Sequence, residues 1–245
     1  MDINMLNNMN TNQEFSREEL FEAYRGCGYT LSVASFNKNL EQLIAGGKIA
    51  RIGRNAYCIP SKALKIYRYD YSDLANEIVS NITENYPLVD FSIFELVQLN
   101  DFANHQIAHN TIFVNVEADA LDFVFETLKE QYPGQILVNP TTEIYHQYWC
   151  ENLIVLGKLV SEAPTGIDED WKARLEKILV DIMANPLILD SVSEGDYPVI
   201  FENAFEHFII DESCLFRYAR RRKVDKKILT LIKEKTNVKL RVKGQ

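Results

Sequence analysis

Residues 31–60 constrain the fold most strongly, because an amphipathic stretch, a glycine pair and a short basic hairpin follow one another directly. Within residues 32–45 the apolar side chains recur at helical spacing and draw one stripe: Phe36, Leu40, Leu43 and Ile44. Gly46 and Gly47 come next, and glycine adopts the left-handed conformation that ends many helices without steric cost. We therefore predict a helix over residues 32–45 that stops at the glycine pair.

Two β-prone runs follow this predicted helix, at residues 48–52 and 56–59. They are joined by residues 53–55, which are suited to a tight turn. The hairpin is basic, since it carries Lys48, Arg51 and Arg54. Upstream, Ser16 and Glu19 have the spacing of a capping box and predict a further helix that ends near Gly26 and Gly28. Helix, helix and basic hairpin in this order predict a winged helix-turn-helix.

The candidate DNA contacts lie on the polar face of the predicted helix and on the hairpin. On a helical wheel, short or polar side chains lie opposite the apolar stripe, and we expect them to meet base edges in a major groove: Ala34, Ser35, Lys38 and Gln42. The hairpin cations would contact phosphates. If so, replacing Arg51 and Arg54 by alanine should reduce the salt slope of DNA binding by about 2 units. The alternative is a winged helix that docks onto another protein.

Charge is strongly segregated along the chain, although the total is −9. Residues 16–68 carry a net charge of +5 and residues 217–245 carry +10, whereas residues 69–216 between them carry −22. Such asymmetry indicates different partners for different parts of a chain. Within the basic run RYARRRK we assign Arg220, Arg221 and Arg222 to a second phosphate-binding surface. A solvated helix end, with cations near its C-terminus, explains the run equally well.

The remainder alternates between strand and helix patterns. We predict strands over residues 89–94, 111–116, 135–138, 144–149 and 153–160. We predict helices over residues 72–86, 118–132, 171–183, 197–208, 211–221 and 224–235, with a loop over residues 163–170. The fold class is therefore mixed α/β, or α+β: a winged helix-turn-helix followed by a larger mixed-sheet domain that ends in a helical cluster. The predicted organisation is a flexible arm (1–15), a winged-helix domain (16–68) and an α/β domain (69–245).

Composition excludes several classes of protein. No apolar run approaches the roughly 20 residues that a membrane helix needs, and the Asn-rich start lacks the pattern of a signal peptide. We therefore expect a cytoplasmic protein without membrane partners. The four cysteines form no C-x-x-C pair, which argues against a zinc ribbon or a redox motif. We expect them to be buried thiols.

No motif for catalysis stands out. The glycine-rich phosphate loops are missing from the sequence. His105 and His109 have the spacing at which two imidazoles on one helix turn share a metal, yet no third ligand is indicated. Asp170 and Lys172 offer the end of a D-x-K nuclease motif, but in an expected loop rather than a strand. We therefore assign no catalytic residue, no metal and no cofactor, and we expect a protein that is not an enzyme.

Three stretches resemble AbiEi-type antitoxins of bacterial type IV toxin-antitoxin (abortive infection) systems: GGKIARIGRNAYCIP, the loop around Pro164, and RLEKILVDIMA at residues 174–184. The resemblance in the wing is carried by Lys48, Arg51, Gly53, Arg54 and Tyr57. Asn55 stands where many members have glycine, and asparagine also tolerates a positive φ.

The resemblance implies a winged helix before a larger, non-enzymatic domain, in a protein that represses its own operon. It also implies that the protein counteracts a nucleotidyltransferase-type toxin encoded beside it. The expected partners are thus double-stranded operator DNA and that toxin. Two alternatives remain: a ligand-sensing transcriptional regulator without a toxin partner, and a metal-dependent enzyme that acts on nucleic acid.

Overall fold

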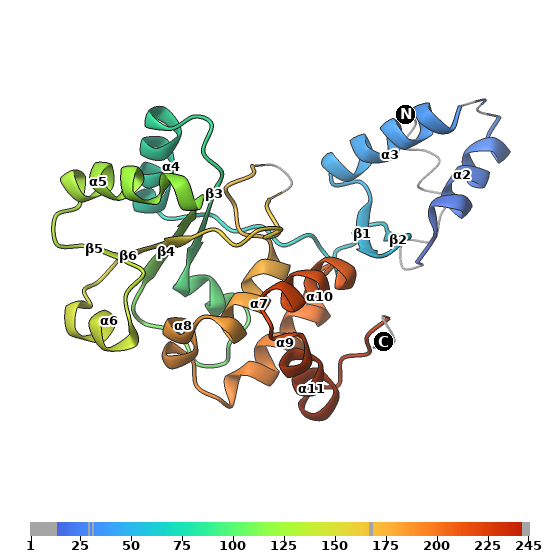
Figure 1. Ribbon diagram of the computed structural model, residues 1–245. Coiled ribbons are helices and arrows are strands. Elements are labelled where there is room, and N and C mark those ends of the chain that lie inside the picture. Colours follow the sequence, from blue (N-terminus) through green and yellow to red (C-terminus); the bar gives the residue numbers. More distant parts are fainter. Residues whose placement is uncertain (1–13, 29, 31, 167–168, 242–245) are drawn as a thin grey trace.

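The computed structural model describes residues 14–28, 30, 32–166 and 169–241. A small N-terminal unit, which we call the winged-helix unit, projects from a larger body (Figure 1). It contains helices α2 (Arg17–Gly26) and α3 (Val33–Ala45) and an antiparallel hairpin of β1 (Ala50–Gly53) and β2 (Ala56–Cys58). Residues 1–13, most of the predicted arm, lie outside the described residues.

The body is built on a four-stranded mixed sheet. Its strands are β3 (Phe91–Glu95), β4 (Thr111–Val116), β5 (Ile136–Val138) and β6 (Leu153–Lys158), in the order β3-β4-β6-β5. β3 runs antiparallel to β4, whereas β4, β6 and β5 are parallel. The central strands read as nearly continuous apolar runs, because the sheet is covered on both faces.

Successive strand residues face opposite layers, as the two-residue period of a strand requires. Ile112 and Val114 pack with α4 (Asp73–Asn85) and α5 (Leu121–Gln131) on one face. Phe113 belongs to the core on the other face, beside the helical cluster. That second side contains α6 (Thr142–Tyr148), α7 (Leu175–Ala184), α8 (Pro186–Ser191), α9 (Asp196–His207), α10 (Glu212–Arg221) and α11 (Asp225–Lys235). Short 3-10 turns, η1 (Leu96–Asp101) and η2 (Ala118–Ala120), complete the fold.

Helix α7 lies at the centre of the helical cluster, and every residue from Leu175 to Met183 is buried. The buried ions on this helix are paired, as burial demands. The Lys177 ammonium lies 2.7 Å from a carboxylate oxygen of Asp181 and 3.1 Å from the side-chain oxygen of Asn115 on β4. The Tyr218 hydroxyl donates to the second oxygen of Asp181, at 3.0 Å. This network connects α7 to the sheet and to α10.

The predicted fold class is confirmed, with corrections in detail. Residues 144–149 form most of helix α6 rather than a strand: Thr141 caps the helix through the amide of Ile144, and only Tyr145 is buried on it. Residues 171–174 are not helical, because the Trp171 carbonyl accepts from the amide of Ile93 and extends the sheet beside β3. Helices η1 and α8 were not predicted.

Three local predictions at the winged-helix unit also need adjustment. Gly46 has a φ of −78°, so only Gly47, with a φ of 64°, takes the left-handed conformation. Phe15 is buried and pairs with Tyr57 through two backbone hydrogen bonds of 2.9 and 3.0 Å, so residue 15 belongs to the winged-helix unit rather than to the predicted arm. Of the four cysteines that we expected to be buried, Cys58 and Cys214 are buried, Cys150 is partly buried and Cys27 is exposed.

Candidate nucleic-acid interface

The two helices of the winged-helix unit meet through aromatic side chains. The ring of Phe36 lies 4.8 Å from that of Phe21 and 5.6 Å from that of Tyr24. The predicted stripe on α3 is confirmed, since Phe36, Leu40 and Leu43 are buried. The capping box at the start of α2 is present, with Ser16 and Glu19 bonded to each other's backbone amides. This core holds α3 with one face outward.

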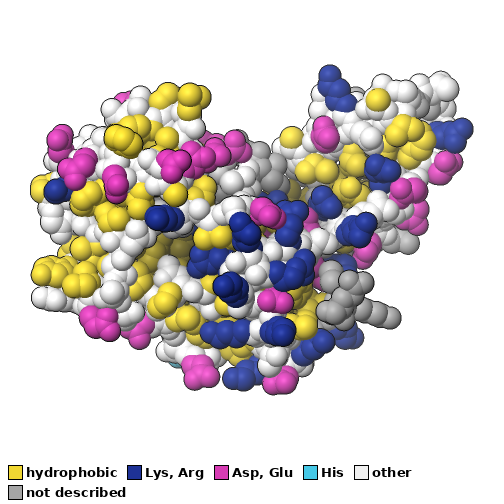
Figure 2. All heavy atoms as spheres, viewed as in Figure 1, with side chains coloured by type: hydrophobic (Ala, Val, Ile, Leu, Met, Phe, Trp, Pro, Cys, Tyr) yellow, Lys and Arg dark blue, Asp and Glu magenta, His cyan; other side chains and the backbone are white. Residues whose placement is uncertain are grey.

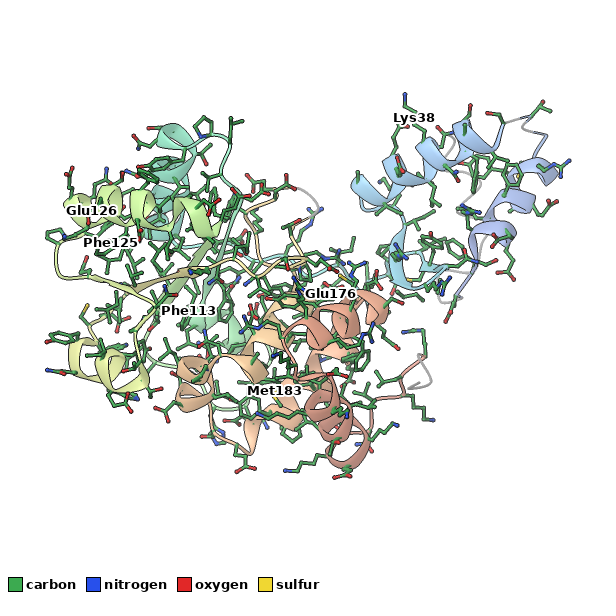
Figure 3. The ribbon with its side chains drawn as sticks, in the orientation of Figure 1. Lys38, Phe113, Phe125, Glu126, Glu176 and Met183 are labelled. Carbon is green, nitrogen blue, oxygen red and sulfur yellow. The ribbon has the colours of Figure 1, made fainter. Side chains whose placement is uncertain are left out.

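The outward face of α3 carries all four residues that the sequence assigned to the groove. Ala34, Ser35, Lys38 and Gln42 are exposed, and Figure 3 shows Lys38 pointing away from α2. Val33 at the start of the helix is also 58% exposed, but it lies seven residues before Leu40 and therefore on the side of the apolar stripe. The outward face therefore offers one cation, two polar groups and one small apolar side chain.

The hairpin is held on both of its faces, unlike a wing that projects freely. Tyr57 packs into the core of the winged-helix unit together with Ile49, which precedes β1. Ala50 and Ile52 face the other way and pack with Ile209 of the body. The body therefore covers one side of the hairpin. The parts of the hairpin left open to a partner are its polar edge and its turn.

The hairpin cations differ in their surroundings. Lys48 and Arg54 are exposed and make no ion pair with any residue that the structure describes. Arg51 is half exposed, and its Nε donates to the Gly53 carbonyl at 3.1 Å. The same Nε lies 3.5 Å from a carboxylate oxygen of Asp211, the residue that caps α10. Part of the charge of Arg51 is thus neutralised within the protein.

The turn of the hairpin is tied to the start of α2. Asn55 has a φ of 55°, so the positive φ anticipated from the sequence is confirmed. Its side-chain oxygen accepts from the amide of Arg17 at 3.1 Å, and its nitrogen donates to Glu18 at 2.7 Å. This second bond is the main cause of the lowered pKa of the Glu18 carboxyl. The turn and the start of α2 therefore form one rigid edge, beside which Arg54 lies.

The second basic segment divides into exposed and structural arginines. Arg220 and Arg221 are exposed at the end of α10, where Arg221 donates to the Ser161 hydroxyl at 2.7 Å. Arg222 is only 21% exposed and lies 3.4 Å from the Asp181 carboxylate on α7. Figure 2 shows Lys and Arg side chains gathered over α10 and α11. Arg220 and Arg221 can therefore contact phosphate, whereas Arg222 stabilises the helical cluster.

The candidate metal and catalytic residues are not brought together. His105 and His109 lie in an irregular segment, where each is 2.8 Å from its own carboxylate, Asp196 and Glu151 respectively. Lys172 pairs with Glu169 at 2.6 Å. Within the described ranges, no group of three or more His, Cys, Asp or Glu side chains has the arrangement of a metal site. No described helix has the length and apolar character needed to cross a membrane.

The fold is thus a winged-helix unit joined to a mixed-sheet body with a helical cluster. Residues 35–238 match the Family of unknown function (DUF6577), and the chain belongs to that family. The match begins within α3 and takes in the hairpin and nearly all of the described body. A comparison with curated proteins found no match.

Proposed function

We propose that this protein is a cytoplasmic, non-enzymatic DNA-binding autorepressor that also acts as an antitoxin. The observation that carries the DNA-binding proposal is the exposed face of α3 beside two exposed hairpin cations that form no ion pair with a described residue. Lys38 and Gln42 supply donors for base edges, and Lys48 and Arg54 supply charge for phosphates. Arg220 and Arg221 give the body a second basic contact.

The antitoxin part of the proposal is supported by the resemblance to AbiEi-type antitoxins. The first stretch that resembles these antitoxins, GGKIARIGRNAYCIP, contains the β1–β2 hairpin. Another, residues 174–184, consists of Arg174 and helix α7. Both are packed into cores, so they support a shared architecture rather than a shared contact surface. The toxin-binding surface is therefore to be sought elsewhere on the body.

The charge of the body favours a protein partner rather than DNA over most of its surface. Residues 69–216 carry a net charge of −22, and Figure 2 shows Asp and Glu side chains gathered over α4 and α5. Such a surface repels a phosphate backbone and attracts basic proteins. We propose that a nucleotidyltransferase-type toxin binds there, while DNA is restricted to the winged-helix unit and the end of α10.

A reporter assay tests repression. The promoter region upstream of this gene is placed before a reporter and measured with the intact protein and with Lys38→Ala/Gln42→Ala. Repression by the intact protein that is lost in the variant supports the proposal. Glu41→Ala, an exposed change on the same helix that removes a negative charge, serves as the control and should retain repression. Equal reporter activity with and without the protein would rule out autorepression.

Co-expression tests the antitoxin role separately. The neighbouring gene is induced alone, with this protein, and with its Lys38→Ala/Gln42→Ala variant. Growth arrest that both forms relieve would show neutralisation by the body, independent of DNA binding. A neighbour that does not arrest growth would contradict the antitoxin role and leave DNA binding intact.

The second candidate function is a ligand-sensing regulator without a toxin partner. The observation that favours it is a cavity of about 530 Å³ at the junction of the winged-helix unit and the body. A ligand bound there would contact both parts and could therefore change how the winged-helix unit is held against the body.

A further inference from the structure

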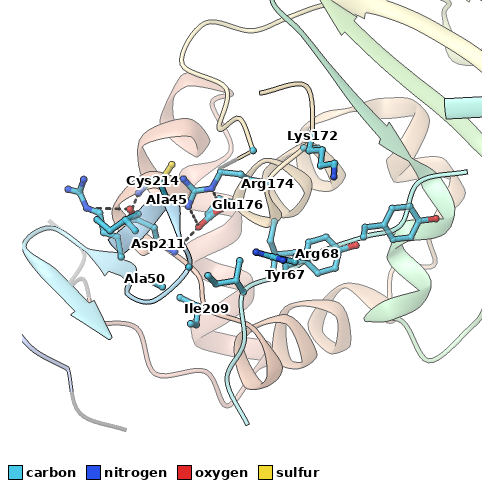
Figure 4. Close-up of a pocket in the computed structure, with 18 of the residues that line it drawn as sticks. Ala45, Ala50, Tyr67, Arg68, Lys172, Arg174, Glu176, Ile209, Asp211 and Cys214 are labelled. Carbon is cyan, nitrogen blue, oxygen red and sulfur yellow. Dashed lines mark hydrogen bonds and ion pairs between the residues drawn. The ribbon is translucent and has the colours of Figure 1, made fainter. Parts of the chain in front are cut away.

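The junction cavity is formed by four segments that are far apart in the sequence (Figure 4). The winged-helix unit contributes the end of α3 and part of β1, and residues 66–71 form the connecting wall. The body contributes residues 172–176 and the start of α10. Its volume lies within the range of about 300–1,000 Å³ that is usual for small-molecule sites. The cavity therefore has the size of a ligand site.

Cations outnumber carboxylates on its walls. The lining includes five basic side chains and three acidic ones: Arg51, Arg68, Lys172, Arg174 and Arg217 against Asp70, Glu176 and Asp211. Glu176 is already bonded to the Arg174 guanidinium and to the Asp211 amide. Asp211 accepts from the Cys214 amide and pairs with Arg51. Each of these pairs takes up one acid and one cation, so the remaining lining charges are Arg68, Lys172 and Arg217 against Asp70. The walls therefore carry a net positive charge that favours an anion.

Three of the cations have bonding capacity that a ligand can use. Arg174 donates Nε and Nη2 to Glu176, at 3.0 and 2.8 Å, and its other N–H groups bond to no described residue. Arginine has five such donors in a planar fork that matches phosphate. Lys172 and Arg217 form ion pairs with Glu169 and Glu162 in which every side chain is at least 36% exposed. Exposed pairs of this kind contribute little, so their cations can turn to a bound anion.

One wall is aromatic. Tyr67, Tyr69 and Tyr71 line the cavity, and the ring of Tyr69 lies 5.1 Å from that of Tyr71 in an edge-to-face contact. The Tyr71 ring is itself held 4.9 Å from Trp171, and its hydroxyl donates to the Ile93 carbonyl. Burial raises the pKa of Tyr69 and Tyr71 to about 12, so both phenols stay neutral. A rigid, neutral aromatic wall suits a planar ring.

We propose that the junction cavity binds a free mononucleotide, with its phosphate at Lys172, Arg174 and Arg217 and its base against Tyr69. A small inorganic anion would use the cations but neither the volume nor the aromatic wall. A neutral aromatic compound would leave the cations without a partner. A nucleotide has both groups: a planar base that can pack against the aromatic wall and a phosphate that can bind the cations. This inference requires neither DNA nor a toxin, and it names a ligand for the cavity on which the second candidate function rests.

Calorimetry on the full chain tests the proposal. AMP, GMP, CMP and UMP are titrated into the protein without DNA, and adenosine and inorganic phosphate are titrated separately. The variants are Arg217→Gln, Tyr69→Ala and Arg25→Gln. Arg25 on α2 is the matched control, because it is also an exposed arginine in an exposed ion pair, with Glu22, but does not line the cavity. Circular dichroism confirms that each variant is folded.

We expect saturable binding of at least one nucleotide that adenosine and phosphate do not reproduce. Arg217→Gln and Tyr69→Ala should each weaken it by about tenfold, the loss of one good contact, and Arg25→Gln should leave it unchanged. Three results would overturn the proposal: no saturable binding at about 1 mM nucleotide, equal binding of inorganic phosphate, or equal effects of all three variants. None of these results would bear on binding of operator DNA.

Discussion

Arg51 on the hairpin lies 3.5 Å from Asp211, the residue that caps α10, so the winged-helix unit is joined to the body by an ion pair. The Asp211 amide in turn donates to Glu176 on α7, at 2.8 Å. This path runs from the hairpin through the start of α10 to the buried centre of the helical cluster. The position of the hairpin therefore depends on the body as well as on its own turn.

This contact changes what we expect from the hairpin arginines. Arg54→Ala should weaken binding to all DNA sequences and reduce the salt slope by about 1 unit, because it removes one cation that is available to contact a phosphate. Arg51→Ala should reduce the slope by less, since Asp211 already neutralises part of its charge. Fluorescence anisotropy at several salt concentrations measures both, with Lys129→Ala on the distant α5 as the control. Equal slopes for the Arg51 and Arg54 variants would contradict the role of Asp211.

The buried pair on α7 should be sensitive to loss of one partner. Lys177→Met leaves the Asp181 carboxylate buried without its main cation, and such a change costs about 3–5 kcal/mol of the free energy of unfolding. Lys226→Met, at an exposed position on α11, should change it by less than about 0.5 kcal/mol. Urea denaturation followed by circular dichroism compares the two. A loss below about 1 kcal/mol for Lys177→Met would show that Asp181 does not depend on this ammonium.

Asn55 combines a positive φ with two bonds to the start of α2, and two substitutions separate these roles. Asn55→Ala loses both bonds and adds left-handed strain, so it should destabilise the winged-helix unit by about 1–2 kcal/mol. Asn55→Gly also loses both bonds, but glycine adopts a positive φ without strain. It should therefore destabilise the winged-helix unit less than Asn55→Ala does. Hydrogen exchange of the α2 amides measures the difference. A glycine variant less stable than the alanine variant would refute the account of the turn.

The tyrosines beside the junction cavity predict a loss of stability at high pH. Burial raises the pKa of Tyr71 from 10 to about 12, so the folded protein keeps this proton where the unfolded chain loses it. The stabilising contribution is therefore fully present below pH 10 and disappears as the pH rises through about 12. Tyr71→Phe should make stability less dependent on pH in that window. Thermal unfolding at a series of pH values tests this, and identical pH profiles for both proteins would contradict it.

Local signals in the sequence predicted much of the fold. The capping box at Ser16, the stripe on residues 32–45 and the apolar strands depend on near neighbours in the chain, and all appear in the structure. The error at residues 144–149 has a local cause too: Ile144, Tyr145, Tyr148 and Trp149 are residue types common in strands, but Thr141 caps a helix there. Residues 171–174 are extended only because β3 lies beside them, which periodicity cannot reveal.

The candidate site was less predictable where it depends on contacts between distant segments. The exposed face of α3 follows from helical spacing, so its residues could be named in advance. The pairing of Arg51 with Asp211 could not, and nor could the burial of Arg222 against Asp181. The junction cavity has no sequence motif at all, because four separate segments contribute to it. Charge segregation indicated only that the ends and the middle of the chain have different partners.

Titration of labelled DNA from upstream of this gene tests whether α3 reads a DNA sequence. The protein is added at several salt concentrations, with a scrambled duplex of equal length as the control and Lys38→Ala/Gln42→Ala as the variant. We predict saturable binding that prefers the upstream sequence, weakens with salt, and loses its preference in the variant. Equal binding of both duplexes, or none, would contradict a DNA-reading role for α3 and identify the winged-helix unit as a protein-docking module.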